Sequence, residues 1–245
     1  LEDNVTVDAL KAYRTGENQD LTNNVYNGLN ELGLSSLIVP EEFGGLGLDS
    51  LFAISVSESL GKGVAPYPFI GSFLIAPFLI NQLGNESQKE KYLPGIATGE
   101  NRFGVALSEI TGRRIDSSIE YSKQRLNGSS LFVMDDIECT HYLIVDSDAG
   151  VHIIDSSNVN MERVDLNTVD VTSFVSELIF NGIETEVLSN DSDNIEIVNQ
   201  AIDLGRIALA ANTLGAAQCM LDQSIEYAKE RKQFGRQIGS FQAVK

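Results

Sequence analysis

The residues with the clearest chemical potential lie at the end of the chain, where basic and aromatic side chains gather within Tyr227–Lys245. The segment carries five basic residues in a protein of formal net charge −18: Lys229, Arg231, Lys232, Arg236 and Lys245. A guanidinium can bond two phosphate oxygens at once, and the ring of Phe234 offers a stacking face. The same charges can instead complement the negative end of a preceding helix, by a few tenths to about 1 kcal/mol each. The segment therefore indicates either an anion site or an ordinary helix terminus.

Two other groups of residues lack the pattern that their chemistry would require. The glycines of 37–49 suggest a phosphate loop, but the spacing is not Gly-x-Gly-x-x-Gly, and Glu41 and Glu42 would repel a phosphate. A tight turn between helices is predicted instead. His141 and His152 are the only histidines, without Cys-x-x-Cys, His-x-x-x-His or clustered carboxylates. We predict surface or strand-edge histidines and no metal site.

The composition bears on partners and location. Asp and Glu number 35 against 17 Lys and Arg, with a pI near 4.4, so we expect neither nucleic acid nor a membrane as partner. Cys139 and Cys219 lie far apart in segments of different type, which predicts two unreactive core thiols in a reducing compartment. The longest apolar stretch, 68–83, is interrupted by proline, glycine and polar residues, which predicts a core helix. We therefore expect a cytoplasmic protein.

The first part of the chain has the periodicity of helices. Apolar residues at helical spacing and capping residues predict helices over about 18–32, 50–60, 68–83 and 85–93, the last ending before Pro94. These elements predict an N-terminal all-α domain, residues 1–102.

The period then changes to that of strands. A short buried strand is predicted at 103–107, and the strongest hairpin signal is Asn127-Gly128 between runs 118–126 and 129–134. Further strands are predicted at 142–145, 151–154, 169–175 and 177–180. The middle is therefore expected to be a small β-domain of barrel or sandwich type, residues 103–188.

Helical periodicity returns at about Asp193 and continues to about Arg231, which predicts one helix on the order of 60 Å long. Its apolar residues cover more than one face, so it must pack on several sides. A loop, a Ser240 cap and the first turn of another helix follow. The last domain, residues 189–245, is thus expected to be a C-terminal α-helical bundle present only in part. Either a longer natural chain or another subunit should cover the helix.

Three segments give the sequence a resemblance to the flavin-dependent acyl-CoA dehydrogenases. They are Val39–Gly47, Ala106–Glu109 and Tyr227–Gln242, the last being the most specific. The resemblance implies an α+β multidomain fold in the order α, β, α.

The family pattern also implies a cofactor site. Arg231, Gln233, Phe234, Phe241 and Gln242 would hold FAD across a subunit interface. The β-domain would supply Leu107, Ser108 and Phe132 to the flavin ring, and Arg206 would lie near the acyl-CoA site or be a solvated helix charge.

The implied activity is α,β-dehydrogenation of an acyl-CoA thioester, in fatty acid or lipid metabolism, with electrons passed to an electron-transferring flavoprotein. The implied assembly is a homo- or hetero-tetramer, in which the chain pairs with itself or with a paralogous acyl-CoA dehydrogenase subunit. The acyl group itself is not specified by the sequence.

The sequence departs from the family pattern at the start of the β-domain. Where the family usually has Thr-Glu-Pro-x-x-Gly-Ser-Asp, residues 108–116 place Ile110 for proline and Arg113 and Arg114 for the polar pair. The two arginines either meet a CoA phosphate or lie in a solvated loop.

Two further departures concern catalysis directly. Phe132–Met134 replaces Trp-Ile-Thr/Ser and removes a hydroxyl, and Gly205 stands where some members carry the glutamate base. The catalytic residue is therefore unknown from this sequence. Two hypotheses follow: part of an active dehydrogenase whose base lies outside residues 1–245, or a non-catalytic subunit that contributes part of a shared FAD site.

Overall fold

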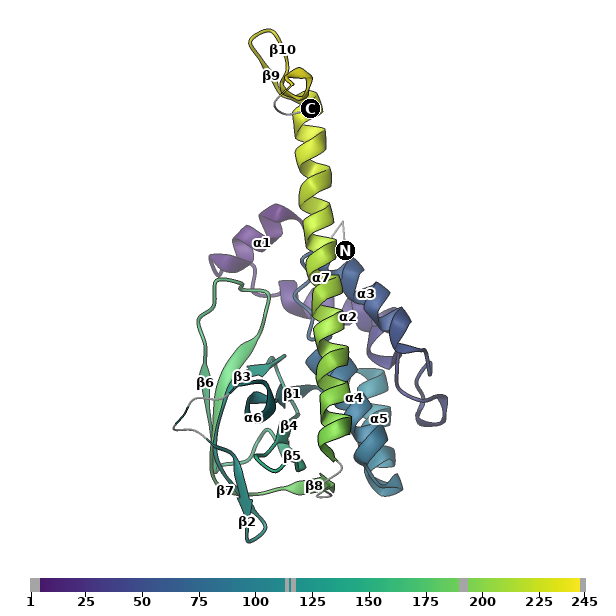
Figure 1. Cartoon of the computed structure of the whole chain (residues 1–245), viewed down its shortest axis with the longest axis vertical. Helices are drawn as coiled ribbons and strands as arrows, with labels where there is room; N and C mark the ends of the chain where they lie inside the picture. Colours follow the sequence, from purple (N-terminus) through teal and green to yellow (C-terminus); the bar gives the residue numbers. More distant parts are fainter. Residues whose placement is uncertain (1–4, 113–114, 116–117, 190–193, 243–245) are drawn as a thin grey trace.

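A computed structural model describes residues 5–112, 115, 118–189 and 194–242. The chain forms a group of helices, then a sheet, and then one long helix that runs past both and carries a small hairpin at its far end (Figure 1). This is the α+β arrangement expected, with the C-terminal helical part represented by one complete long helix.

The first hundred residues are helical, as predicted. The helices are α1 (Val7–Arg14), α2 (Leu21–Glu31), α3 (Ser50–Lys62), α4 (Ala76–Leu83) and α5 (Glu86–Thr98), with a π-helical turn at Gly71–Ile75 and 3-10 turns at Leu34–Ser36 and Glu41–Phe43. Asp49 caps α3 by accepting from the Leu51 N–H at 2.7 Å, and Asn85 and Gln88 form a capping box on α5. The glycine-rich segment is a tight turn between helices, as predicted.

Two details of the helical part differ from the sequence prediction. Helix α1 was not predicted, because it is short and its apolar side chains, such as Leu10 and Tyr13, are only partly buried against the core. Helix α5 continues through Pro94 instead of ending before it. Pro94 and Glu90 lie on the exposed face, where water can bond the carbonyl that proline leaves free, while Ile96 is buried and holds the last turn in the core.

The middle of the chain forms one eight-stranded mixed sheet. Its strands are β1 (Phe103–Ala106), β2 (Glu120–Ser122), β3 (Arg125–Met134), β4 (His141–Val145), β5 (Val151–Asp155), β6 (Met161–Asp165), β7 (Val175–Glu184) and β8 (Glu186–Ser189), with a short helix α6 (Ser108–Thr111) after β1. The order is β6-β7-β3-β1-β4-β5-β8, with β2 paired to β3; β1 and β4 are parallel and the other pairs antiparallel.

The predicted position of the hairpin turn was wrong. The turn lies at Lys123 and Gln124, which both have positive φ, whereas Asn127 and Gly128 lie inside β3. Gly128 is required there for another reason: a Cβ would lie 1.7 Å from the Ser118 carbonyl oxygen, where the chain that leads into β2 lies against β3. This close approach, rather than a turn, explains the glycine.

Other strand predictions were incomplete. Strands β6 and β8 were not predicted; β6 is an exposed edge strand, so no buried alternation marks it. The predicted strand 169–175 is instead a loop, in which the Asp170 carboxylate accepts hydrogen bonds from Thr172 and Ser173. Side chains that bond their own backbone neighbourhood compete with strand pairing.

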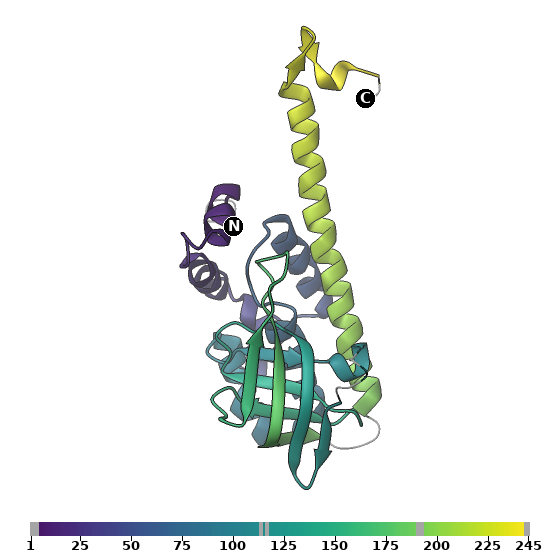
Figure 2. The ribbon, with the colours of Figure 1, turned by 90° about the vertical axis from the view of Figure 1, so that its left-hand side faces the viewer.

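The long helix α7 (Asn194–Glu230) confirms the predicted element. Its part up to Gly215 packs against the N-terminal helices and meets α3, where Gly61 and Gly215 let the two backbones touch: a Cβ at Gly215 would lie 1.9 Å from the Glu58 carbonyl oxygen. The remaining part, toward the hairpin, stands clear of the helices and the sheet in both views (Figures 1 and 2) and exposes Met220 and Leu221.

One continuous hydrophobic core joins the helices, one face of the sheet and the start of α7. It includes Phe73, Leu74, Ile80, Leu93, Phe103, Leu143, Val151, Val198 and Ala201. A second core of Leu126, Tyr142, Ile154, Leu178, Phe180 and their neighbours fills the opposite face of the sheet. The sheet is therefore fixed to the helices by side chains from both.

Among the residues that the structure describes, no helix combines the length and the apolarity needed to cross a membrane.

The contact between α3 and α7 gives a stability prediction. Gly215→Ala should lower the free energy of unfolding by about 1–3 kcal/mol, because the new methyl group must push the two backbones apart. Gly28→Ala is the matched control: it also lies in a helix, has no atom within 4 Å of an added Cβ, and should gain up to about 1 kcal/mol. Thermal and urea unfolding followed by circular dichroism measure both, and an unchanged or raised stability of Gly215→Ala would contradict the backbone contact.

Candidate functional site

A cavity of about 720 Å³ lies where α3, the π-helical turn, the sheet and α7 meet. Its walls are mainly apolar and come from all four: Leu60 and Val64, Ile70 and Ile75, Leu107 and Met134, and Ile202 and Leu209. Such a cavity between elements from different parts of the chain is typical of a small-molecule site.

The predicted flavin-contacting residues of the sheet reach this cavity only in part. Leu107 lines it and is buried. The Ser108 hydroxyl is buried and lies 2.8 Å from the Ser130 hydroxyl. Phe132 is 60% exposed and has a positive φ of 59°, a conformation that is rare for a bulky residue. Met134, which replaces the hydroxyl of the family pattern, lines the wall.

The wall formed by α7 has no side chain at the position where some family members carry a base. A Cβ at Gly205 would lie 2.7 Å from the Ile75 Cδ1 atom, so Ile75 occupies that space. Arg206 also lines the cavity, but its guanidinium bonds Asp203 at 3.0 Å and its side chain is 68% exposed. Arg206 is therefore a solvent-exposed helix residue, ion-paired on its own helix, at the edge of the cavity.

The sequence prediction missed Asp135, an acidic residue that follows strand β3 and lines the cavity. Its Oδ2 atom accepts hydrogen bonds from the Gly71 N–H at 2.5 Å and the Ser72 N–H at 3.1 Å, at the start of the π-helical turn. Burial raises the pKa of Asp135 from 3.8 to about 6, against the opposing effect of the two N–H groups. Its φ of +57° shows a strained backbone.

A signal for Asp135 was present in the sequence. It follows directly on Phe132–Met134, the segment that the family pattern places over the flavin, and it ends a strand whose inward side chains are buried. A carboxylate at that point was bound to lie near the site.

The predicted clamp residues lie at the far end of α7. Strands β9 (Lys232–Gln233) and β10 (Arg236–Gln237) pair as a hairpin, followed by a 3-10 turn at Ile238–Ser240. Arg231, Gln233 and Gln242 are exposed, and Phe234 is 93% exposed. Phe241 meets Phe234 edge to face at 6.3 Å and carries the Arg236 guanidinium over its ring at 3.9 Å. The hairpin thus presents cations and an aromatic face to solvent.

Within one chain, the hairpin and the cavity are not brought together. Both views show the hairpin at the tip of α7, beyond the helices and the sheet (Figures 1 and 2). Arg113, Arg114 and Lys245, which were also considered as anion ligands, lie outside the described residues.

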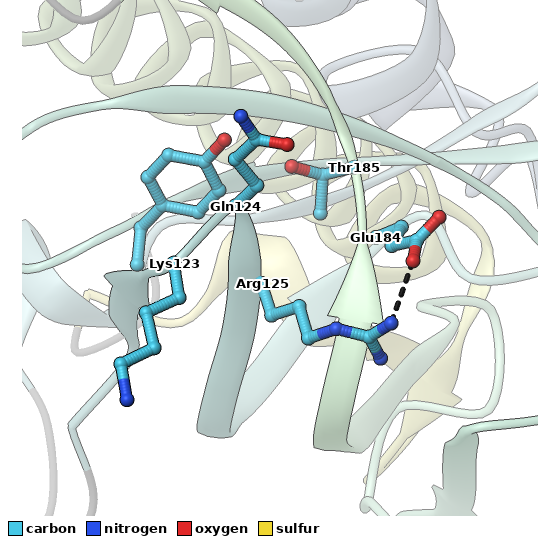
Figure 3. Close-up of a pocket in the computed structure, with 6 residues that line it drawn as sticks. Lys123, Gln124, Arg125, Glu184 and Thr185 are labelled. Atoms are coloured by element: carbon cyan, nitrogen blue, oxygen red, sulfur yellow. Dashed lines mark hydrogen bonds and ion pairs between the residues drawn. The ribbon is translucent and has the colours of Figure 1, made fainter.

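A second hollow, of about 560 Å³, lies beside the β2–β3 hairpin and is polar. Lys123, Gln124, Arg125, Glu184 and Thr185 line it, and the Arg125 guanidinium is paired with Glu184 at 2.6 Å (Figure 3). No predicted site residue lies there.

One prediction for the histidines was wrong. His152 is fully buried: its Nε2 atom lies 2.8 Å from the Asp146 carboxylate and its Nδ1 atom 3.0 Å from the Thr185 hydroxyl. These partners satisfy both ring nitrogens, which explains why a polar ring is tolerated inside the sheet. His141 is half-buried and stacks on Phe103.

The structure also bears on the predicted metal sites and cysteine thiols. In the described ranges, no group of three or more His, Cys, Asp or Glu side chains is arranged to hold a metal ion. Cys139 and Cys219 are both free and half-buried, rather than fully in the core. Burial raises the pKa of the Cys139 thiol, which keeps it protonated.

Comparison with known proteins places these features in a family. The family model described as "Acyl-CoA dehydrogenase, N-terminal domain" matches residues 1–100, and "Acyl-CoA dehydrogenase, C-terminal domain" matches residues 195–245. The chain is 30% identical over 244 residues to the acyl-CoA dehydrogenase of Bacillus subtilis (strain 168), covering 86% of this chain and 62% of the relative.

Solved structures agree. A structure of the electron transferring flavoprotein of Acidaminococcus fermentans matches with a TM-score of 0.78 and 28% identity, over 92% of this chain and 64% of the other. The butyryl-CoA dehydrogenase of Megasphaera elsdenii matches with a TM-score of 0.77 and 24% identity, over 100% of this chain and 73% of the other, which shows the shared fold. The chain spans about three fifths of the length of the curated relatives that it matches first, 62% and 59%.

The environment of Asp135 predicts a pH dependence of stability. Its raised pKa means that the folded chain binds more protons than the unfolded chain between about pH 4 and pH 6, so this group lowers stability as pH rises through that window. Asp135→Asn carries no charge. Its stability relative to the parent should therefore rise between about pH 4 and pH 6, by at most about 3 kcal/mol. Thermal unfolding across this range measures the difference, and a difference independent of pH would contradict a desolvated carboxylate.

Proposed function

The chain belongs to the acyl-CoA dehydrogenase family, and from this premise we propose that it is part of an FAD-dependent enzyme that oxidises the Cα–Cβ bond of an acyl-CoA thioester. The electron acceptor proposed is an electron-transferring flavoprotein. The observation that carries the proposal is the mainly apolar cavity, which is lined both by Met134 of the family's flavin-facing segment and by the long helix α7.

The residues present fit FAD, which the family uses as a flavoprotein cofactor. The guanidinium of Arg231 forms no ion pair with any of the described residues, so it is available to a pyrophosphate. Phe234 offers an exposed ring to the adenine. Gln233 and Gln242 add amide groups beside them. When bound, FAD supplies a two-electron acceptor for hydride transfer.

The cavity walls would receive the flavin ring and the acyl group. Leu107 and Met134 present apolar surface from the sheet, and Ile75 and Ile202 present it from the helices. Walls of this kind exclude water from the reacting carbons and strengthen the electrostatic interactions inside the site. Phe132 and Ser108, the remaining predicted contacts, are not among the lining residues; each is close in sequence to one, Met134 and Leu107, and Ser108 is held by Ser130.

A complete site would require two chains. Because the hairpin lies far from the cavity of its own chain (Figure 2), we propose that it completes the cavity of a neighbouring copy or paralogous subunit. The exposed apolar side chains on the second half of α7, such as Met220, Leu221 and Ile225, support burial of this helix in the natural protein.

A second candidate function is that of a non-catalytic subunit. It is favoured by Ile75, which fills the space beside Gly205 and leaves no room for a base on α7 without rearrangement. Of the described residues that line the cavity, only Asp135 and Asp170 are carboxylates. In this candidate, the chain contributes its hairpin to the FAD site of an active partner.

The FAD proposal predicts a specific loss. Arg231→Ala should weaken FAD binding by about tenfold to a hundredfold, because charge-assisted hydrogen bonds to phosphate are lost. Lys229→Ala is the matched control from the same basic segment: its ammonium is already paired with Glu226 at 2.6 Å, so it should bind FAD nearly as before. Fluorescence titration of the natural protein with FAD measures both. Equal affinities for the two variants would remove the assigned clamp role.

The two candidate functions differ in one spectroscopic outcome. If the protein is itself a dehydrogenase, adding acyl-CoA esters under anaerobic conditions should bleach the absorbance of its bound FAD, and an artificial electron acceptor should restore it. Bound FAD that stays oxidised with every ester, while a paralogous partner restores turnover, would establish the non-catalytic subunit instead.

A further inference from the structure

The wall of the cavity contains a carboxylate without a counter-charge. Asp135 Oδ2 is bonded by two backbone N–H groups, but none of the described residues donates to Oδ1, and none of the described cations forms an ion pair with the carboxylate. A partly desolvated carboxylate normally has a positive partner. The rest of the cavity lining is mainly apolar, and its other charged side chains are Arg206 and Asp170.

The titratable groups around Asp135 do not supply that partner. Tyr67, from the segment before the π-helical turn, donates its hydroxyl proton to Asn30, and the Cys139 thiol is neutral. Asp136, the adjacent carboxylate, already holds Arg163 at 2.6 Å. Arg206, the arginine that lines the cavity, is paired with Asp203 and exposed.

We infer that the acyl group taken by this cavity carries a protonated amine, which pairs with Asp135, so that the substrate is an aminoacyl thioester. This inference rests on the proposed function, because it assumes that the cavity receives the acyl group. A protonated amine donates up to three hydrogen bonds and would complete the free oxygen of Asp135.

The chemistry of dehydrogenation favours the same assignment. The transition state for loss of the α-proton develops negative charge on the thioester, and an uncompensated carboxylate nearby opposes that charge. A cationic acyl group neutralises Asp135 and removes this repulsion. A purely aliphatic acyl group would leave it in place.

Binding of matched ligands tests the inference. The ligands are pentanoyl-CoA amide, in which NH replaces the thioester sulfur to prevent reaction, and four analogues with one amino group on carbon 2, 3, 4 or 5. Calorimetry at about pH 8 with the FAD-supplemented natural protein should show at least one amino analogue binding about tenfold to a hundredfold more tightly than pentanoyl-CoA amide.

Two variants locate the effect. Asp135→Asn keeps an oxygen that can accept from the Gly71 N–H, and it should lose the preference for an amine, measured as the ratio of the two affinities within the same variant. Asp170→Asn is the matched control, since Asp170 also lines the cavity but is exposed and bonded to Thr172 and Ser173. It should keep the preference.

A measurement on the parent protein avoids any folding defect of the variants. Lowering the pH through about 6 protonates Asp135 and should abolish the preference for the amine. Tight binding of pentanoyl-CoA amide with no preference for any amino analogue would overturn the inference while leaving the proposed function intact. Failure of all five ligands to bind would instead overturn the proposed function.

Discussion

The structure depends on the close approach of α3 and α7. At Gly61 and Gly215 the two helices touch backbone to backbone, and no side chain separates them. This contact holds α7, from its start to Gly215, against the N-terminal helices, and the start of α7 continues into the core that holds the sheet. The cavity adjoins this contact, since Gly61 of α3 and Asn212 of α7 both line it, so part of its wall is formed by two closely packed helices.

The site combines rigid support with local strain. Phe132 and Asp135 both adopt positive φ within one short segment at the end of β3, and Asp135 is tied to the start of the π-helical turn. Strained backbone and π-helical turns both concentrate at functional sites. The Asp135 carboxylate, at the end of β3, bonds the first two N–H groups of the π-helical turn and so links the sheet to the helices at the cavity wall. A change in the charge of this carboxylate would therefore affect the packing of the sheet on the helices.

Periodicity and capping residues were enough to predict the order of helices and strands, the Asn85 cap and nearly the full extent of α7. The prediction failed where the role of a residue depends on neighbours that periodicity does not show. Gly128 is small because the chain leading into β2 lies against it at Ser118, and His152 is buried because Asp146, in the turn before β5, and Thr185 satisfy its ring. The place of Ile75 beside Gly205 arises only when α7 packs on the π-helical turn, whereas the place of Asp135 could have been inferred from the segment that precedes it.

The hairpin at the end of α7 is joined to the rest of the molecule by a single unbroken helix. About 25 residues separate Gly205, in the cavity wall, from the last residue of α7, which sets Gly205 and the hairpin roughly 40 Å apart along the axis. Inserting or deleting one residue in this span would move the hairpin by about 1.5 Å and turn it by about 100° around the axis. The number of residues in α7 therefore fixes both the distance and the direction at which the basic, aromatic hairpin lies from the cavity wall.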